Sequence, residues 1–195
     1  MLDYGGYRWQ TLGELDAGRV AVELGEEFVA VAGLPGEQPL DRLLAAMAAR
    51  HRRMGGGLLG LRWIIFDEVG ACGWTGLVGR PDGAWETATY LHPRVWGSGL
   101  NALCKSLLWQ LASEIAGRAQ LEISIDAGNH RSVRANRRLF PAREMHTGAD
   151  LWRGRVSTVI VADRAPVGYR PLDAAQMEAA RQIVERSAAE ALGRA

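Results

Sequence analysis

The chain has 195 residues, of which 48% are hydrophobic, and this suits one globular domain or a domain with an appendage. A formal net charge of +1 argues against a surface that binds nucleic acid mainly through phosphate contacts. No apolar run approaches the roughly 18 residues of a membrane-spanning helix, and the amino terminus lacks the pattern of a secretory signal. We therefore expect a cytoplasmic protein with neither a membrane nor a nucleic-acid partner.

The first third of the chain has the weakest pattern. Two apolar runs, at 20–24 and 28–32, flank Gly25 and predict a pair of strands. Further on, apolar residues recur at helical spacing over 40–51, and three glycines at 55–57 end the run. The second segment predicts an amphipathic helix.

The rest of the chain alternates strand-like and helix-like segments. Runs of β-branched and aromatic residues predict strands, whereas apolar residues three or four apart predict helices. The predicted order is strands over 58–66, 71–78 and 84–92, a helix from residue 100, a strand over 120–126, a short helix ending near 140, a hairpin of 143–152 and 155–162, and a helix within 171–195 capped by Asp173. Strands 84–92 and 120–126 flank one crossover helix, so they should lie parallel in a mixed sheet.

A glycine-rich turn separates strand 84–92 from the helix that follows it. Pro93 stops the strand, and Gly97 and Gly99 precede the first apolar residue of the helix. A turn without side chains at a helix N-terminus presents backbone N–H groups and the positive end of the helix dipole. This geometry predicts a phosphate-bearing ligand, whose class it leaves open.

The spacing Arg94-x-x-Gly97-x-Gly99 resembles the coenzyme-A-binding signature of the GNAT acetyltransferase superfamily. Beyond the next strand, Asn129 and Ser132 open a short basic helix and resemble the second motif of that family. The two motifs together favour coenzyme A over a glycine turn that serves packing alone.

Within the superfamily, the chain looks most like the branch that contains the ribosomal-protein N-terminal acetyltransferases, because Tyr90 and Pro93 precede the glycines. The resemblance covers about residues 58–163 and implies an α/β fold with a GNAT-like mixed central sheet flanked by helices. We expect one acyltransferase domain over residues 1–195, with 164–195 as a C-terminal helical extension.

The resemblance also implies roles for individual residues. Acetyl-CoA is expected as co-substrate, held by the backbone amides of the turn, the strand edge before it and the basic helix after it. The residues expected to bind it are Tyr90, Leu91, His92, Arg94, Val95, Trp96, Gly97, Ser98, Gly99, Leu100, Asn129, Arg131 and Arg134. Related enzymes place the base that deprotonates the amine at the position of Glu86. Ser132 or solvent would protonate the leaving thiolate, because Asn136 stands where many members have a tyrosine.

These features predict an acyltransferase that moves an acetyl group from acetyl-CoA directly to a primary amine, either a protein N-terminus or a small molecule. Neither Cys72 nor Cys104 lies in a nucleophile motif, which favours transfer without a covalent intermediate. The histidines lack zinc-site spacing, so no metal is expected. The C-terminal helix packs on the sheet or on a second copy of the chain, and this leaves a homodimer open.

Two alternatives compete with this interpretation. A GNAT-like domain could bind coenzyme A without turnover, as a scaffold or sensor. Alternatively, residues 99–106 match a nucleotide-binding P-loop at every defined position except Cys104, which replaces the second glycine. A P-loop needs residues 99–104 as an open cradle, whereas here they continue an apolar helical stripe. The stripe predicts Lys105 as a solvent-facing residue of the helix.

Overall fold

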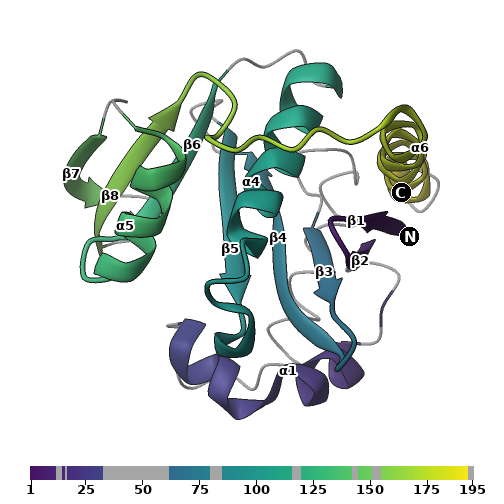
Figure 1. Ribbon diagram of the computed structural model, residues 1–195, viewed down its shortest axis with the longest axis horizontal. Helices are drawn as coiled ribbons and strands as arrows, with labels where there is room; N and C mark the ends of the chain where they lie inside the picture. The colour runs from purple at the N-terminus through teal and green to yellow at the C-terminus, as the bar shows by residue number, and fades with distance from the viewer. Residues whose placement is uncertain are drawn as a thin grey trace.

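An eight-stranded mixed sheet forms the centre of the fold (Figure 1). The computed structural model describes residues 1–11, 15, 17–32, 62–79, 85–115, 120–141, 145–150 and 155–192. The strands, in spatial order, are β1 (Leu2–Tyr4), β2 (Tyr7–Thr11), β3 (Arg62–Phe66), β4 (Ala71–Gly79), β5 (Trp85–Leu91), β6 (Leu121–Asp126), β8 (Arg155–Ala162) and β7 (Met145–Asp150). Neighbouring strands of this sheet are antiparallel except β5 and β6, which are parallel. The predicted α/β class, mixed sheet and parallel pair are confirmed.

Four α-helices are described around the sheet. They are α1 (Ala17–Ala32), α4 (Leu100–Gln110), α5 (His130–Leu139) and α6 (Ala174–Leu192). A 3-10 turn over Pro93–Val95 precedes α4, and a π-helical turn over Leu111–Ile115 follows it. Figure 1 shows α4 crossing the sheet in front of β4 and β5, and α5 lying beside β6 and β8. The predicted helix over 40–51 and its glycine stop at 55–57 lie outside the described residues.

The strand pair predicted at 20–24 and 28–32 is wrong, because this segment is α1. Val20 and Leu24 are both buried, as expected for residues four apart on a helix, whereas Val22 is 83% exposed. A strand would place all three side chains on one face. Gly25 breaks the helix locally with φ 71° and ψ 171°, so the predicted turn became a kink inside α1.

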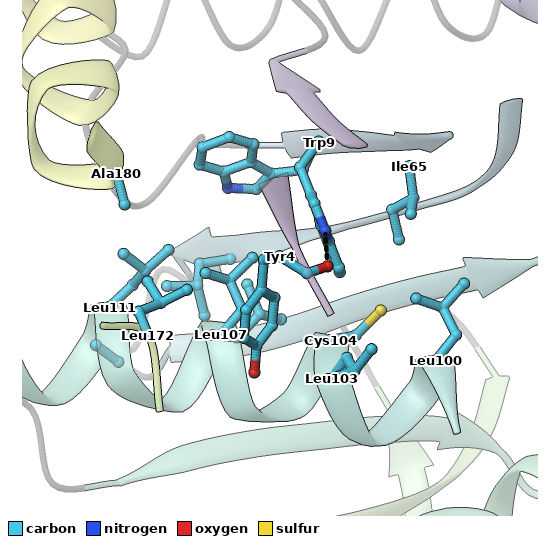
Figure 2. Packing of buried hydrophobic residues seen from close by; sticks show 14 of the residues in the cluster. Tyr4, Trp9, Ile65, Leu100, Leu103, Cys104, Leu107, Leu111, Leu172 and Ala180 are labelled. Carbon is cyan, nitrogen blue, oxygen red and sulfur yellow. Dashed lines mark hydrogen bonds between the residues drawn. The ribbon is translucent and has the colours of Figure 1, made fainter. Parts of the chain in front are cut away.

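The amino-terminal hairpin of β1 and β2 was not predicted and extends the sheet on the side of β3. Its core residues are Leu2, Tyr4 and Trp9. The Trp9 indole N–H donates to the Tyr4 carbonyl at 3.0 Å. Figure 2 shows both rings above α4, where Leu103 and Leu107 lie close by. The hairpin therefore closes one end of the hydrophobic core.

The C-terminal helix packs back on the fold at the outer strand β1 (Figure 1). Asp173 caps α6 as predicted: its Oδ1 accepts from the Gln176 backbone N–H at 2.8 Å, and Gln176 Oε1 accepts from Asp173 N–H at 3.0 Å. The Gln176 amide also donates to the Asp3 carbonyl at 2.7 Å. On the preceding segment, Leu172 N–H donates to Gln110 Oε1 of α4 at 2.7 Å. These bonds tie the extension to β1 and α4.

Candidate active site

A cavity of about 730 Å³ lies where β5 and β6 part. The two strands pair only at Glu86, opposite Glu122, near the start of each strand. Beyond that pair, residues 86–91 of β5 and 123–126 of β6 line the cavity together with the start of α4 and one side of α5. The edge of β5 is therefore open toward β6 along the length that was predicted to pair with an amide-rich ligand.

The glycine turn forms one end of this cavity. Gly97 and Gly99 have φ of 82° and 87°, which side chains rarely tolerate, and a Cβ on either would meet no atom within 4 Å. The backbone N–H groups of Gly97, Gly99 and Asn101 make no hydrogen bond within the described residues, whereas those of Val95 and Ser98 donate to backbone carbonyls. Three free amides at the N-terminus of α4 suit a phosphate, although fewer amides are available than the sequence predicted.

Arg94 does not line the cavity, in contrast to its predicted role. Its guanidinium donates to both carboxylate oxygens of Asp67, from Nε at 2.9 Å and from Nη2 at 3.2 Å. Nη2 also donates to the carbonyls of Gly70 at 3.2 Å and Ala71 at 2.7 Å. The side chain thus fastens the glycine turn to the β3–β4 loop, and the prediction that it binds the ligand is corrected.

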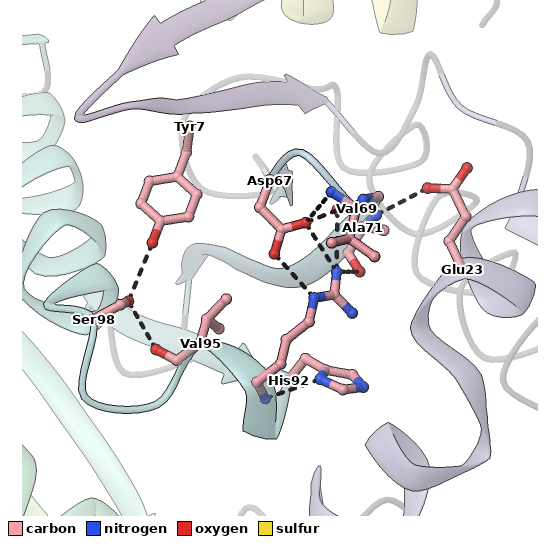
Figure 3. Close-up of polar contacts among 10 residues, drawn as sticks. Tyr7, Glu23, Asp67, Val69, Ala71, His92, Val95 and Ser98 are labelled. Atoms are coloured by element: carbon pink, nitrogen blue, oxygen red, sulfur yellow. Dashed lines mark hydrogen bonds and ion pairs between the residues drawn. The ribbon is translucent and has the colours of Figure 1, made fainter.

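His92 and Ser98 are likewise absent from the cavity lining. His92 Nδ1 accepts from the Arg94 backbone N–H at 3.1 Å and caps the 3-10 turn. Ser98 Oγ donates to the Val95 carbonyl at 2.8 Å and accepts from the Tyr7 hydroxyl at 3.2 Å, as Figure 3 shows. Both side chains thus shape the turn from outside the cavity through hydrogen bonds to nearby backbone groups.

Three polar residues at α5 line the cavity, and they are Asn129, Ser132 and Asn136. Asn129 caps the helix, with Oδ1 accepting from Ser132 N–H at 3.0 Å, and both residues line the cavity. Asn136 lines it too and is 4% exposed; its Nδ2 donates to the Ser132 carbonyl at 3.0 Å, while its Oδ1 is buried without a partner. A donor on a ligand would satisfy this oxygen.

Of the four arginines on α5, two line the cavity and two do not. Arg131 and Arg138 line the cavity, whereas Arg134, which was predicted to bind the ligand, and Arg137 do not. The Arg131 Cζ atom lies 3.1 Å from the centre of the Trp96 ring, and this cation–π contact joins α5 to the glycine turn. A helix displays residues three apart on neighbouring faces and cannot aim all four arginines at one ligand.

Glu86 lies at the closed end of the cavity, opposite the glycine turn along β5. Its side chain is 1% exposed, and it belongs to the strand pair that joins β5 to β6. Tyr90 and Leu91 line the cavity nearer the turn, and the Tyr90 ring packs on Trp74 with 4.9 Å between ring centres. The predicted base is thus buried at the end of the cavity remote from the free amides of the glycine turn.

Lys105 is not solvent-facing, and that prediction is wrong. Its side chain is 3% exposed and lines the cavity from α4. The ammonium donates to Thr87 Oγ1 at 2.8 Å and to Thr89 Oγ1 at 3.1 Å. Burial lowers the pKa of Lys105 to about 8, although the nearby Cys104 and Glu86 partly oppose that shift. Because residues from Leu100 onward are helical, no open P-loop cradle exists at this position.

Comparison with known proteins identifies the family. The family described as acetyltransferase (GNAT) domain matches residues 11–139, which is more than half of the chain. The chain belongs to the GNAT acetyltransferase family. It is therefore a transferase whose donor is acetyl-CoA, and the prediction of family, fold and co-substrate is confirmed at this level.

Several solved acetyltransferase structures share the fold of this chain. A GNAT acetyltransferase from Bacillus anthracis superposes with a TM-score of 0.60 at 8% identity, covering 82% of this chain and 96% of that one. A chimera of spermidine N-acetyltransferase SpeG from Vibrio cholerae and hSSAT gives 0.57 at 13% identity, with 81% and 95% covered. The N-acetyltransferase PseH of Campylobacter jejuni in complex with acetyl coenzyme A gives 0.53 at 13% identity, with 82% and 99% covered. At these identities the likeness is one of fold, and no curated protein matches the sequence significantly.

The cavity of this GNAT domain fits the coenzyme that its family uses. Its volume lies within the usual range for small-molecule sites, and the open edge of β5 and the free amides suit a ligand with a phosphate end and an amide-rich arm. Lys105, Asn136 and Arg138 line it but were not predicted to bind the ligand. In the described part of the chain, no three His, Cys, Asp or Glu side chains lie close enough to hold a metal ion, and no helix is long and apolar enough to cross a membrane.

Proposed function

We propose that this protein is an N-acetyltransferase that moves the acetyl group of acetyl-CoA directly to a primary amine, with Glu86 as the base. One observation carries the proposal: a buried carboxyl group lies at the closed end of the cavity whose other end is formed by the glycine turn. A coenzyme whose phosphates bind the turn would extend its arm along β5 toward Glu86.

The residues have distinct tasks in this scheme. Bound acetyl-CoA supplies the acetyl group on a thioester. The amides of Gly97, Gly99 and Asn101 hold its pyrophosphate, and Arg131 with Arg138, in place of Arg134, are proposed for its remaining phosphate. Glu86 accepts a proton from the amine, directly or through water, because only the neutral nitrogen has the lone pair that attacks the carbonyl carbon.

The acceptor and the setting of the enzyme are part of the proposal. The likeness to the ribosomal-protein branch favours a protein N-terminus, and the fold shared with a spermidine N-acetyltransferase makes spermidine a suitable small-molecule probe. We propose a single acyltransferase domain over residues 1–195 that acts in the cytoplasm, with 164–195 as its extension.

Thermal unfolding tests the donor site first. Acetyl-CoA and coenzyme A, each at about a hundred times its Kd, should raise the midpoint by about 5 °C or more. The double variant Gly97→Glu, Gly99→Glu should lose this shift, because two carboxylates then face the phosphates. Gly148→Glu on the exposed strand β7 is the matched control, since a Cβ there also meets open space. A shift with ATP alone would instead support a nucleotide site.

Thiol release then tests catalysis, with spermidine and a peptide with a free N-terminus as acceptors. Glu86→Gln should lower kcat by about a hundredfold or more, while the thermal shift with acetyl-CoA remains. An unchanged rate would remove Glu86 from the mechanism. If the wild type binds coenzyme A but releases no thiol with either amine, the protein is a binding domain of the scaffold or sensor class.

A further inference from the structure

The ammonium of Lys105 is the buried cation of the cavity that the proposed mechanism leaves without a task. Two of its three N–H groups donate to Thr87 and Thr89, and it forms no ion pair within the described residues. The third N–H is therefore available to a ligand. Burying this charge is costly, and Glu86 offsets only part of the cost because no carboxylate of the described residues contacts the ammonium; such a group in a cavity is a candidate for function.

The position of Lys105 along the cavity matches the reactive end of the coenzyme. Thr87 and Thr89, which hold the ammonium, lie next to the Glu86 level of β5, where β5 and β6 pair. Their side chains point to the other face of the strand from Glu86, but Glu86 and Lys105 line the same cavity and interact electrostatically. The glycine turn begins beyond Leu91, about 13 Å from Thr87 along an extended strand. Coenzyme A carries its sulfur at the end of the arm remote from its phosphates. If the phosphates occupy the turn, the sulfur lies at the level of Lys105.

We propose that Lys105 is the acid that protonates the coenzyme A sulfur as the acetyl group leaves. The inference rests on the proposed function and names its missing proton donor. As the C–N bond of the amide forms, Glu86 takes a proton from the nitrogen, and Lys105 gives a proton to the sulfur, which keeps the electron pair of the broken C–S bond. Glu86 then releases its proton and neutral Lys105 takes one up, so that charges and protons balance.

Three further observations support this assignment. A pKa of about 8 keeps Lys105 mostly protonated at neutral pH while making its proton easy to transfer. Asn136, at the place of the usual tyrosine, has no acidic proton to give. Lys105 is also the only lysine among 23 basic residues, and an arginine could not serve because guanidinium does not release its proton.

Other charged groups act on the same cavity and must be considered in any pH study. The charged ones are Glu86 on β5, Asp126 on β6, and Arg131 and Arg138 on α5; the Cys104 thiol next to Lys105 can titrate as well, but burial raises its pKa to about 12. Only variants that differ at Lys105 itself can therefore isolate its contribution.

The test compares coenzyme A with desulfo-coenzyme A, which lacks the sulfur, by titration calorimetry from about pH 6 to about pH 9.5, around the titration of a free thiol. No amine acceptor is needed. In the wild type, the affinity ratio of coenzyme A to desulfo-coenzyme A should rise about tenfold from about pH 6 to about pH 8, because the Lys105 ammonium favours the thiolate, and should fall again at higher pH, where Lys105 loses its proton. In Lys105→Met the ratio should fall with pH, because a thiolate would enter an apolar site without a cation.

Three controls separate the outcomes. Lys105→Met must bind desulfo-coenzyme A like the wild type, and Lys105→Gln, which can still pair with the threonines, should lose the rise in the same way. Ser132→Ala should keep the wild-type rise; loss of the rise in this variant instead would assign the sulfur to Ser132. If Lys105→Met keeps the rise, Lys105 is not the proton donor, but the proposed acetyltransferase function is unaffected. If the wild type binds neither compound, the proposed function fails as well.

Discussion

Replacing Lys105 by methionine should change how the stability of the protein depends on pH. The ordinary lysine pKa of 10.5 falls to about 8 in the fold, mainly because burial disfavours the charged form. A difference of this size corresponds to about 3 kcal/mol of unfolding free energy. Because the folded-state pKa is lowered, the cost is fully present below about pH 8. It disappears as the pH rises toward 10.5, where the unfolded chain still binds the proton and the folded protein has lost it.

The methionine variant has no such titration. At neutral pH it should be as stable as the wild type or more stable, because relief of the buried charge outweighs or balances the loss of two hydrogen bonds. Loss of those bonds leaves the Thr87 hydroxyl buried without its donor, which costs about 1–3 kcal/mol at every pH. The difference in unfolding free energy between the wild type and Lys105→Met should therefore shift by about 3 kcal/mol in favour of the wild type between about pH 7 and about pH 10.5.

Urea unfolding without ligand, repeated across that pH range, measures the difference directly. The double variant Lys105→Met, Thr87→Val is the matched control, because it removes the stranded hydroxyl and should recover stability equally at every pH. A constant difference between wild type and Lys105→Met over the whole range would refute the reasoning, since it would mean that the ammonium is not buried.

Two further predictions concern the glycine turn. Gly97→Ala and Gly99→Ala should each lower the unfolding free energy by about 1–2 kcal/mol, because φ is above 80° at both positions. Gly148→Ala is the control and should be close to neutral, because Gly148 lies in an open strand position without a positive φ. Melting midpoints of the three variants measure the difference. Arg94→Ala should lower stability by about 2 kcal/mol and change coenzyme A affinity by less than about threefold, since its partners belong to the β3–β4 loop. Burial raises the pKa of Asp67, but Arg94 and the backbone N–H groups of Val69 and Gly70 together lower it below its ordinary value of 3.8, so the loss of stability in Arg94→Ala should fade in acid as Asp67 becomes protonated. A calorimetric loss of coenzyme A affinity without a loss of stability would contradict this assignment.

The sheet from β3 to β8 could be predicted because its strands follow one rule. Each run of β-branched and aromatic residues is bounded by turn residues, and the single crossover through α4 fixes β5 and β6 as parallel. Residues 20–24 fit either period, since positions four apart repeat in a helix and in a strand. Strands β1 and β2 were missed because three and five residues carry little pattern of their own. Pairing with β3 stabilises β2, and pairing with β2 and contact with α6 stabilise β1.

Site residues could be predicted where their backbone, rather than a long side chain, forms the site. The glycines, the strand edge and the cap at Asn129 depend on local chain geometry, and all three line the cavity. Arg94 was misassigned because the direction of its side chain is set by Asp67, which lies 27 residues earlier in the chain. Spacing in a motif locates a backbone position, but the partner of a long side chain comes from tertiary structure.

The burial of Lys105 also depends on tertiary structure and could not be predicted from spacing along the helix. Helix α4 is enclosed all round: residues 103 to 108 are all buried, so an apolar stripe no longer marks which positions face solvent. In such a helix, each polar side chain needs its own partner. Ser106 accepts from the Arg170 backbone N–H at 3.2 Å, on the segment before α6, while Lys105 turns to Thr87 and Thr89 of β5. Two threonines at alternate positions of a strand, together with the polar pair Lys105 and Ser106 between the leucines of the helix, were therefore the signal in the sequence, and they indicate buried polar contacts rather than an exposed lysine.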